Sequence, residues 1–297
     1  MKIDKRVDKL LVLGSGGRLG LAIAHHAPEL FKDLDIVFHY GRKPIAGLGE
    51  SCDLTDINAV LSLFKKVNPA FILNLAAITD VDFCESNSQV AINSNVTAVK
   101  NIAFASQVCG ARLVHISTDH VYASSGLSAE NDTDIKNVYA LTKYAGESYV
   151  LNAGGVVLRT NFFGKTFSVS RKDFTGWIYD NLRSGKTIQA FHDVYFSPLS
   201  IKTLIRCIGI VLRSNVNGLF NLGSRDGCSK YDFIMEFARL IGYENGDIRS
   251  ASIEDMRSLK APRPKDMRMN SSNFEKTFGT MLPLIIDEID NVSKEYE

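Results

Sequence analysis

A tyrosine and a lysine four residues apart, Tyr139 and Lys143, could carry acid–base chemistry. On a helix this spacing places both side chains on one face. A phenol with its ordinary pKa near 10 is a weak acid–base catalyst at pH 7, but an ammonium group about 4–5 Å away would lower that pKa by roughly 2–3 units. About twenty residues upstream, Thr118 ends an apolar segment and offers a hydroxyl. Together the three side chains could bind a substrate carbonyl, donate a proton and lower the pKa of the proton donor.

A glycine-rich segment predicts a dinucleotide site. Gly14, Gly17 and Gly20 follow the first apolar segment in a G-x-x-G-x-x-G pattern. Glycines there allow a tight turn, close approach of the backbone to a pyrophosphate, and close packing of the next helix. The pattern can also be an ordinary glycine-rich turn, but its position after the first strand of an alternating α/β chain favours dinucleotide binding. The spacing is typical of short-chain dehydrogenases.

The residues after the second predicted strand bear on the choice of cofactor. An NAD site usually has an acidic residue there to bind the ribose hydroxyls. Here Arg42 and Lys43 follow the strand, with no carboxylate, and Arg18 is a third cation that could meet a 2′-phosphate. The two loop cations could instead simply be solvated. We therefore expect NADP(H) to be preferred, with NAD(H) left open.

Strand and helix patterns alternate along the first half of the chain. Apolar runs predict strands at residues 9–14, 35–39, 71–75, 112–117 and 156–160. Helices are predicted between them at residues 18–27, 56–67, 89–109 and 138–152, with Pro28 ending the first and Thr55 or Asp56 capping the second. Such alternation requires a parallel sheet with right-handed crossovers. The predicted fold class is α/β, a Rossmann-type doubly wound parallel sheet with a smaller C-terminal substrate-binding lobe.

The second half of the chain is less regular. Its patterns predict helices at residues 199–213 and 230–241, a strand at 218–222, and a helix-free turn at 261–264. We predict an NAD(P)-binding Rossmann domain over residues 1–160. Residues 161–297 would form mainly the substrate-binding lobe, with segments around residues 190–225 returning to the Rossmann sheet.

The composition argues against several classes of protein. Lys and Arg number 34 and Asp and Glu 33, a net charge of +1, so no field favours nucleic acid as a partner. No apolar run could span a bilayer, and the polar start of the chain does not resemble a signal peptide. The five cysteines are scattered without metal-ligand spacing. We expect a cytoplasmic protein with reduced thiols and no membrane partner.

Several specific strings carry a resemblance to a known family. They are residues 74–82 (NLAAITDVD), 110–119 (GARLVHISTD), 137–139 (NVY), 145–147 (AGE), 158–160 (LRT), 263–266 (RPKD) and 272–274 (SNF). From residue 10 to about residue 283 the chain resembles the dTDP-4-dehydrorhamnose reductases, which are extended short-chain dehydrogenases. The resemblance implies NAD(P)H-dependent reduction of the 4-keto group of a nucleoside-diphosphate deoxysugar, in the biosynthesis of deoxysugars and surface polysaccharides.

The resemblance also implies roles for the residues that match the family's motifs. Thr118, Tyr139 and Lys143 match the catalytic set, and the tyrosine and lysine also contact the cofactor. The other matches are Gly14, Gly17, Arg18, Leu19 and Gly20 at the pyrophosphate; Asp53 and Leu54 at the adenine; Ala76, Ala77 and Thr79 beside the ribose and nicotinamide; Val81 and Asn161 at the sugar; and Arg263 at the substrate diphosphate. Some have simpler explanations, since Asp53 could cap a helix, the two alanines could be core, and Asn161 could be a turn residue.

Three departures from the family pattern concern the substrate and a metal. His120 stands where the reductases usually have an aromatic residue, and Phe162 where they usually have tryptophan. Both positions face the sugar in the family, so we expect a roomier, more polar pocket and a preferred substrate other than dTDP-4-keto-L-rhamnose. Ala22 replaces a glutamate that in some members helps to bind Mg²⁺ at a dimer interface, so no metal is predicted. The sequence leaves the oligomeric state open, a homodimer being one arrangement.

Two other functions remain as alternatives to a plain ketoreductase. A bifunctional epimerase-reductase would use His120 as the base that moves a proton next to the keto group, a task that suits an imidazole near neutral pH. A non-catalytic NADP-binding regulatory subunit, resembling that of methionine adenosyltransferase, would not need the intact Thr118, Tyr139 and Lys143 set that this chain keeps. A dehydratase is disfavoured, because those relatives have Asp-Glu after the threonine and this chain has Asp119 and His120.

Overall fold

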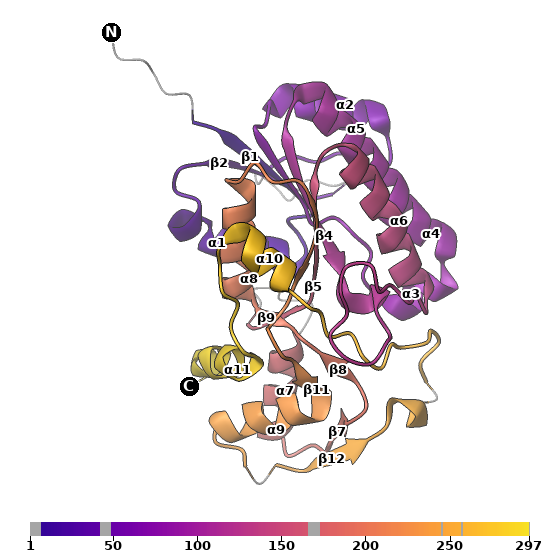
Figure 1. Cartoon of the computed structure of the whole chain (residues 1–297), viewed down its shortest axis with the longest axis vertical. Helices are drawn as coiled ribbons and strands as arrows, with labels where there is room; N and C mark the ends of the chain where they lie inside the picture. The colour runs from indigo at the N-terminus through magenta and orange to yellow at the C-terminus, as the bar shows by residue number, and fades with distance from the viewer. Residues whose placement is uncertain (1–6, 42–48, 166–172, 245, 257, 297) are drawn as a thin grey trace.

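The strand β1 (Lys9–Leu13), second from one edge of the main sheet, determines where the main cleft of the molecule lies. In the computed structural model, which describes residues 7–41, 49–165, 173–244, 246–256 and 258–296, β1 pairs with β2 (Asp35–His39) on one side and β3 (Phe71–Asn74) on the other. Beyond β3 follow β4 (Arg112–Thr118), β5 (Val156–Thr160) and β10 (Gly218–Leu222), in the order β10-β5-β4-β3-β1-β2 (Figure 1). All pairs are parallel, which confirms the predicted Rossmann-type sheet.

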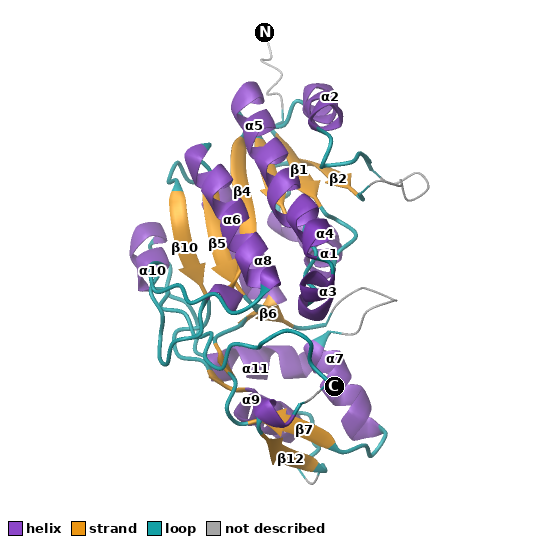
Figure 2. Cartoon of the chain, turned by 90° about the vertical axis from the view of Figure 1, so that its right-hand side faces the viewer, coloured by secondary structure: helices purple, strands orange, loops and turns teal. Residues whose placement is uncertain are grey.

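Alternate residues of β1 point into two different cores. Leu10 and Val12 belong to the core beneath α1 (Arg18–Leu30) and α8 (Ile201–Leu212). Leu11 and Leu13 belong to the core beneath α2 (Ile57–Val67), α5 (Ala98–Cys109) and α6 (Val138–Asn152). Figures 1 and 2 show these two groups of helices on opposite faces of the sheet. A strand covered on both faces must be apolar throughout, which explains why the sequence pattern of β1 is a continuous apolar run.

Two helices differ from the sequence predictions. α1 does not end at Pro28 but continues to Leu30. The proline lies in the last turn, where its missing N–H costs the helix one backbone hydrogen bond and does not end it. The helix predicted at residues 89–109 follows α3 (Val81–Ser86) and is divided into α4 (Ser88–Ile92), a π-helical turn over Asn93–Thr97, and α5. In that turn the buried Asn95 bonds the backbone N–H and C=O of Ile78, at 2.9 and 3.0 Å, after β3. The widened turn therefore serves a contact that local propensity does not encode.

The second half of the chain adds a lobe at the C-terminal edge of the sheet (Figures 1 and 2). Its core lies among α7 (Phe174–Arg183), α9 (Lys230–Leu240) and α11 (Ile285–Ser293). Short pairs of strands complete it: β7 (Ile188–Phe191) with β12 (Ile248–Ala251), β8 (Tyr195–Phe196) with β11 (Cys228–Ser229), and β6 (Phe162–Phe163) with β9 (Leu199–Ser200).

The elements of this lobe were only partly predicted from the sequence. The sequence did not predict α7, α11 or α10 (Ser272–Phe278), which packs against β10. The helix predicted at residue 199 begins at Ile201, because residues 199–200 form β9 and Ser200 caps α8. Short segments whose structure depends on partners far along the chain carry weak local patterns.

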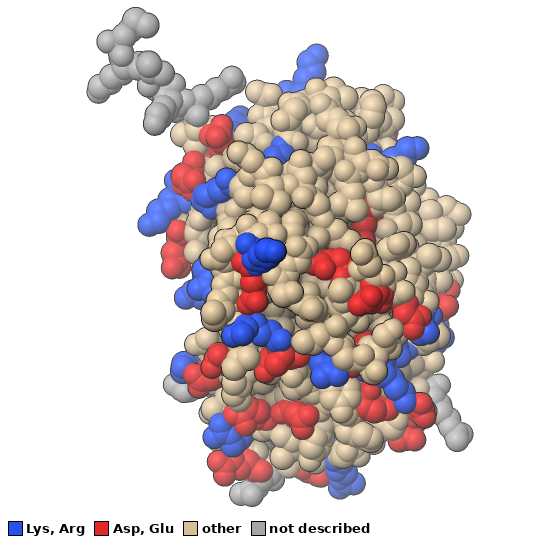
Figure 3. Space-filling model, in the orientation of Figure 1, with Lys and Arg blue, Asp and Glu red and all other residues tan. Residues whose placement is uncertain are grey.

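Basic and acidic side chains are interspersed on the face seen in Figure 3, more densely over its lower half than over its upper half. This agrees with the net charge of +1. Within the described ranges, no helix combines the length and apolar character that crossing a membrane requires.

Candidate active site

The glycine-rich turn after β1 forms a cradle of bare backbone. Gly14 has φ +84°, and a Cβ there would lie 2.6 Å from the backbone nitrogen of Ala76. A Cβ on Gly20 would lie 2.5 Å from the Cα of Ser15, so α1 packs directly on the turn. Gly17 is the N-cap of α1 and supplies no side-chain cap, and the first turn has no acidic residue. The first N–H groups of α1 are therefore left for an anion, and the cradle fits the pyrophosphate of a dinucleotide.

The cleft beside this cradle lies at the point where the strand order reverses. β1 has β2 on one side and β3 on the other, and sheets of this kind bind ligands at the C-terminal ends of the strands next to such a reversal. Predicted site residues that line the cleft are Gly14, Gly17, Arg18, Leu19, Gly20, Ala77, Thr79, Thr118, His120, Tyr139, Lys143, Asn161 and Phe162. The structure thus brings the glycine turn and the Tyr-Lys helix to one cavity.

Thr118 and Tyr139 meet at the base of the cleft. Thr118 ends β4, Tyr139 lies in the first turn of α6, and their exposed fractions are 4% and 7%. Asn137 caps α6 by accepting the N–H of Ala140 at 2.9 Å, which fixes where Tyr139 begins the helix. The hydroxyl of Tyr139 hydrogen-bonds the side chain of Thr118. Two hydroxyls are therefore available to one substrate oxygen.

The expectation that Lys143 lowers the pKa of Tyr139 is wrong for this structure. Burial raises that pKa above its ordinary value, the negative charge of Asp119 adds to the increase, and the hydrogen bond from Thr118 opposes it only in part. Lys143 itself is 2% exposed and bonds to the C=O of Ile116 at 2.8 Å and to Nε2 of His115 at 3.2 Å. Burial lowers the pKa of Lys143 to about 8, opposed by Glu147. The prediction rested on the charge of the lysine alone, whereas desolvation is the largest cause of the pKa shifts of both buried groups.

His120 and Asn161 line the cleft next to Tyr139 and Asp119. The amide of Asn161 donates to Asp119 at 2.7 Å, and the ring of His120 lies edge-on to Tyr139 with centroids 5.4 Å apart. Nδ1 of His120 is buried and finds no hydrogen-bond partner among the described residues. Burial lowers the pKa of His120 to about 3, and the cations of Lys230 and Arg263 lower it further. His120 is therefore a neutral ring with one unused nitrogen.

Lys230 lines the cleft and was not predicted from the sequence. It is the first residue of α9, and its Nζ lies 5.9 Å from the ring centroids of Phe174 and Phe196. Its side chain forms no ion pair or hydrogen bond with the described residues, although the carboxylate of Asp119 raises its pKa against the effect of burial. One signal could have found it: a lysine in the first turn of a helix is unfavourable, because its charge faces the positive end of the helix dipole.

Other predicted residues lie outside the cleft lining. Arg42 falls in residues 42–48, outside those the structure describes. The carboxylate of Asp53 accepts a hydrogen bond from Thr55, and the C=O of Leu54 accepts one from Asn101. The N–H of Ala76 donates to Asn74, and Val81 packs beside Tyr139. The last of these residues is Arg263. Arg263 is paired with Asp82 at 3.0 Å and bonds the C=O of Ala261. Its charge still acts on His120 and Lys230.

A buried ion pair supports the catalytic helix from behind. Arg159 on β5 and Glu147 on α6 are bonded at 2.6 Å, with side chains 1% and 3% exposed. Ser117 donates to the same carboxylate at 2.5 Å, and Arg159 also bonds the hydroxyl of Tyr122 at 2.8 Å. Separating the members of a buried charge pair would leave an uncompensated charge in the interior, which costs free energy. The pair therefore holds β4, β5 and α6 in fixed positions relative to one another.

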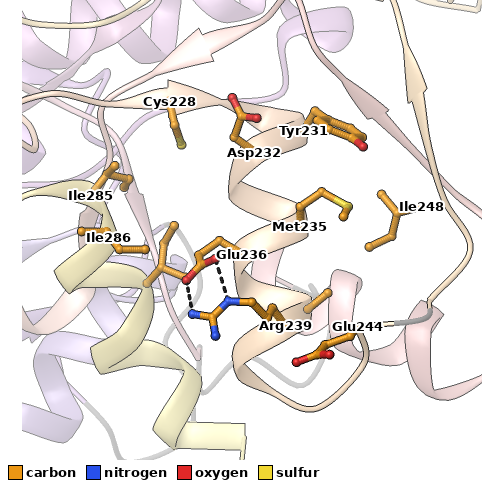
Figure 4. A pocket seen from close by; sticks show the side chains of 12 residues that line it. Cys228, Tyr231, Asp232, Met235, Glu236, Arg239, Glu244, Ile248, Ile285 and Ile286 are labelled. Atoms are coloured by element: carbon orange, nitrogen blue, oxygen red, sulfur yellow. Dashed lines mark hydrogen bonds and ion pairs between the residues drawn. The ribbon is translucent and has the colours of Figure 1, made fainter.

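A second hollow lies on the C-terminal lobe between α9 and α11 (Figure 4). Its walls include Met235, Ile286 and Ile289, and an ion pair between Glu236 and Arg239, both on α9 and drawn in Figure 4, lies along one wall. It contains none of the predicted site residues, so the cleft at the sheet edge is the candidate active site.

Comparison with known proteins agrees with this geometry. Residues 8–297 match the family described as RmlD substrate binding domain. A probable low-salt glycan biosynthesis reductase, Agl14 of Haloferax volcanii, is 28% identical over 94% of this chain and 95% of its own. The dTDP-4-dehydrorhamnose reductase of Salmonella typhimurium is 26% identical over 78% of this chain and 81% of its own.

Solved structures give the same result. That of a dTDP-4-dehydrorhamnose reductase from Clostridium acetobutylicum is 25% identical, covers 97% of this chain and 99% of its own, and has a TM-score of 0.85. That of the Bacillus anthracis enzyme in complex with NADP, at 24% identity, covers 98% of this chain and 100% of its own with a TM-score of 0.83, and shows the shared fold. The match over residues 8–297 establishes that this chain belongs to the RmlD substrate binding domain family.

Proposed function

We propose that this protein is an NADPH-dependent reductase of the 4-keto group of a nucleoside-diphosphate deoxysugar. One observation carries the proposal: the hydrogen-bonded hydroxyls of Thr118 and Tyr139 lie in the same cleft as the glycine cradle. The named relatives, reductases of nucleotide sugars and of glycan synthesis, support the same reaction. NADH is a second cofactor that the cradle would accept.

In the proposed reaction, Thr118 donates a hydrogen bond to the keto oxygen and Tyr139 gives its proton to the alkoxide that forms. The bound nicotinamide supplies the hydride. The raised pKa of Tyr139 suits the reduction, because the phenol stays protonated at neutral pH and can donate its proton to the alkoxide when the alkoxide forms. The N–H groups at the start of α1, with Gly14, Gly17, Arg18, Leu19 and Gly20, would hold the pyrophosphate, and Ala76, Ala77 and Thr79 the nicotinamide side. Arg42, Asp53 and Leu54 would hold the adenosine end.

The part of the cleft that is lined by His120, Asn161 and Lys230 would bind the nucleotide sugar. Lys230 and Arg263 bring positive charge to this side of the cleft, which suits a diphosphate. His120, Asn161, Phe162 and Val81 would contact the sugar. The pKa of His120 near 3 makes this ring a poor base at neutral pH, which favours simple reduction over the epimerase-reductase alternative.

A comparison of several nucleotide sugars as substrates tests this proposal. Because His120 and Phe162 replace larger or differently polar groups of the relatives, we propose a 4-keto-6-deoxyhexose other than dTDP-4-keto-L-rhamnose. A site built to bond a hydroxyl rejects an analogue that lacks it strongly, whereas added apolar bulk discriminates by only about 1–3 kcal/mol. The values of kcat/KM should be measured for dTDP-, UDP-, GDP- and CDP-linked 4-keto-6-deoxyhexoses. Absence of hydride transfer with all of them would refute the reductase assignment, and a more than tenfold preference for the L-rhamnose precursor would refute the substrate choice.

Three further features remain part of the proposal. They are a location in the cytoplasm, the absence of a metal from the interface of any homodimer, and the division into a nucleotide domain at residues 1–160 and a mainly substrate-binding lobe at residues 161–297, with segments around residues 190–225 returning to the Rossmann sheet.

A further inference from the structure

A buried chain of hydrogen bonds runs from the end of β3 to Lys143. His115, on β4, has no exposed surface. Its Nδ1 lies 2.9 Å from the side-chain nitrogen of Asn74, and its Nε2 lies 3.2 Å from Nζ of Lys143. Both ring nitrogens therefore face polar partners, so the ring could not be turned over without placing carbon atoms against them.

The orientation of the Asn74 amide is fixed by the backbone. Its Oδ1 accepts the N–H of Ala76 at 3.0 Å, so Nδ2 must be the atom that faces His115. An amide NH₂ can only donate. Nδ1 of His115 must then accept, and it carries no proton.

The positions of the protons on His115 and Lys143 follow from the same rules for donors and acceptors. A neutral imidazole has one N–H, and with Nδ1 unprotonated it must be on Nε2. That N–H points at Nζ of Lys143, which also donates to the C=O of Ile116 at 2.8 Å. An ammonium group has no lone pair and cannot accept a hydrogen bond, whereas an amine can.

We propose that His115 is a positioning residue that, together with Asn74, couples the charge of Lys143 to the tautomer of the ring: while Nε2 of His115 carries the proton, Lys143 is an uncharged amine. For Lys143 to become an ammonium and keep its contact with His115, the ring must move its proton from Nε2 to Nδ1. Asn74 must then turn its oxygen towards the ring, which breaks its hydrogen bond to the N–H of Ala76, the residue before Ala77 of the cleft lining. The charge of the lysine, the tautomer of the histidine and the backbone at Ala76 thus change together. The catalytic consequence rests on the proposed function, but the hydrogen-bond arrangement does not.

The surroundings of Lys143 allow it to change its charge near neutral pH, because burial lowers its pKa to about 8 and Glu147 opposes the decrease. On its own helix Lys143 is near Tyr139, whose raised pKa keeps the phenol neutral, and Glu147, the anion that opposes the loss of its charge. That carboxylate is engaged by Arg159 on β5. From β4, the pKa of His115 is lowered far below its ordinary value by burial and by the lysine, so the ring does not become a cation.

Nitrogen NMR of the unmodified protein with ¹⁵N-labelled histidine and lysine tests the proposal without substrate. At pH 8.5 and above, His115 should be protonated on Nε2 only and Lys143 should be an amine. As the pH falls, the proton of His115 should move to Nδ1 with the same midpoint as the titration of Lys143, while the ring stays neutral. An Nδ1–H ring at high pH, or a ring that does not change while Lys143 titrates, would overturn it.

Asn74→Asp is a matched variant of nearly the same shape. The carboxylate can accept from both Ala76 and Nδ1 of His115, so His115 should be protonated on Nδ1 at every pH and the midpoint of Lys143 should rise by roughly one pH unit or more. Asn101→Asp is the control, because Asn101 donates to Leu54 at 3.1 Å and does not contact the ring. An unchanged midpoint in folded Asn74→Asp protein contradicts the proposal. Because neither experiment measures turnover, a failure of the reductase assignment would not be confused with it.

Discussion

The hydroxyl of Tyr139 on α6 is hydrogen-bonded to the side chain of Thr118 at the end of β4. The proposed proton donor is thus aimed at the same point as the group that would bind the substrate oxygen. The charge of Arg18 lowers the pKa of the phenol, but burial outweighs this effect and keeps the pKa high. The pair is organised to deliver a proton and to leave the resting phenol neutral.

Replacing the proton donor should abolish most of the turnover. In Tyr139→Phe the ring remains and the acid is lost, so we expect kcat to fall by roughly a hundredfold or more, the usual contribution of a positioned acid. The affinity for NADPH, measured by fluorescence titration, should change little. Near-normal kcat in the variant would show that another group donates the proton.

Lys230→Met should weaken binding of the nucleotide sugar. Loss of one charge-assisted hydrogen bond costs about 1.5–3 kcal/mol, so KM should rise roughly ten- to a hundredfold, while NADPH binding is retained. Lys186→Met, at an exposed lysine after α7, is the control for loss of a positive charge. If both variants have the same KM, Lys230 does not contact the substrate.

Arg42→Ala should reduce the affinity for NADPH far more than that for NADH. One charge-assisted bond to the 2′-phosphate is worth about 1.5–3 kcal/mol, which is roughly ten- to a hundredfold in Kd. Arg225→Ala, at an exposed arginine on the other lobe, should alter neither value. Equal losses for the two cofactors would refute the role of Arg42 in cofactor choice.

Asp119→Asn should increase stability at neutral pH. Burial raises the pKa of this carboxyl from 3.8 to about 6, so the folded protein keeps its proton at pH values where the unfolded chain has lost it. Stability due to this group therefore falls as the pH rises from about 4 to about 6. A difference of about two pKa units corresponds to at most about 3 kcal/mol in the free energy of unfolding.

Urea unfolding of both proteins between pH 3.5 and pH 7 measures this effect. The difference between them removes contributions common to both, such as the histidines. It should be small at pH 3.5 and should grow to its full value above pH 6, in favour of the variant. A variant that is less stable than the original chain at pH 7 would mean that the ionised carboxylate, through its bond to Asn161, stabilises the fold.

Any homodimer should survive EDTA. Ala22 is fully buried in the core shared with α8, so it offers no oxygen to a bridging Mg²⁺, which needs hard oxygen ligands. Sedimentation velocity with and without the chelator measures this, and a chelator-dependent shift to monomer would require other carboxylates at the interface.

The sequence predicted the parts of the site that depend on local pattern. The glycine turn, Thr118 at a strand end and the Tyr139–Lys143 spacing each follow from neighbours along the chain, and the parallel sheet brings strand ends together. The site's electrostatics could not be predicted in this way. Whether the pKa of Tyr139 rises or falls depends on how deeply it is buried, which is a property of the packed molecule.

The missed residues depend on contacts between distant segments. Lys230 reaches the cleft only because the lobe that contains α9 lies at the C-terminal edge of the sheet (Figure 2), and a single lysine in the sequence does not indicate this. The bond between Asn74 and His115 joins residues 41 positions apart, through pairing of β3 with β4. The sequence showed both residues within the family strings but offered no reason to connect them.

The position of β10 has a consequence for anyone who wishes to work with half of this protein. It comes from the second half of the chain and covers the edge of β5, whose Val156, Val157 and Leu158 are fully buried. α8, from the same half, covers one face of the sheet. A fragment that stops at residue 160 would present an apolar strand edge and an uncovered sheet face to water, which is the arrangement that leads to aggregation. Excision of the nucleotide-binding half as a free-standing reagent should therefore fail unless residues 199–222 are supplied with it, for example by circular permutation.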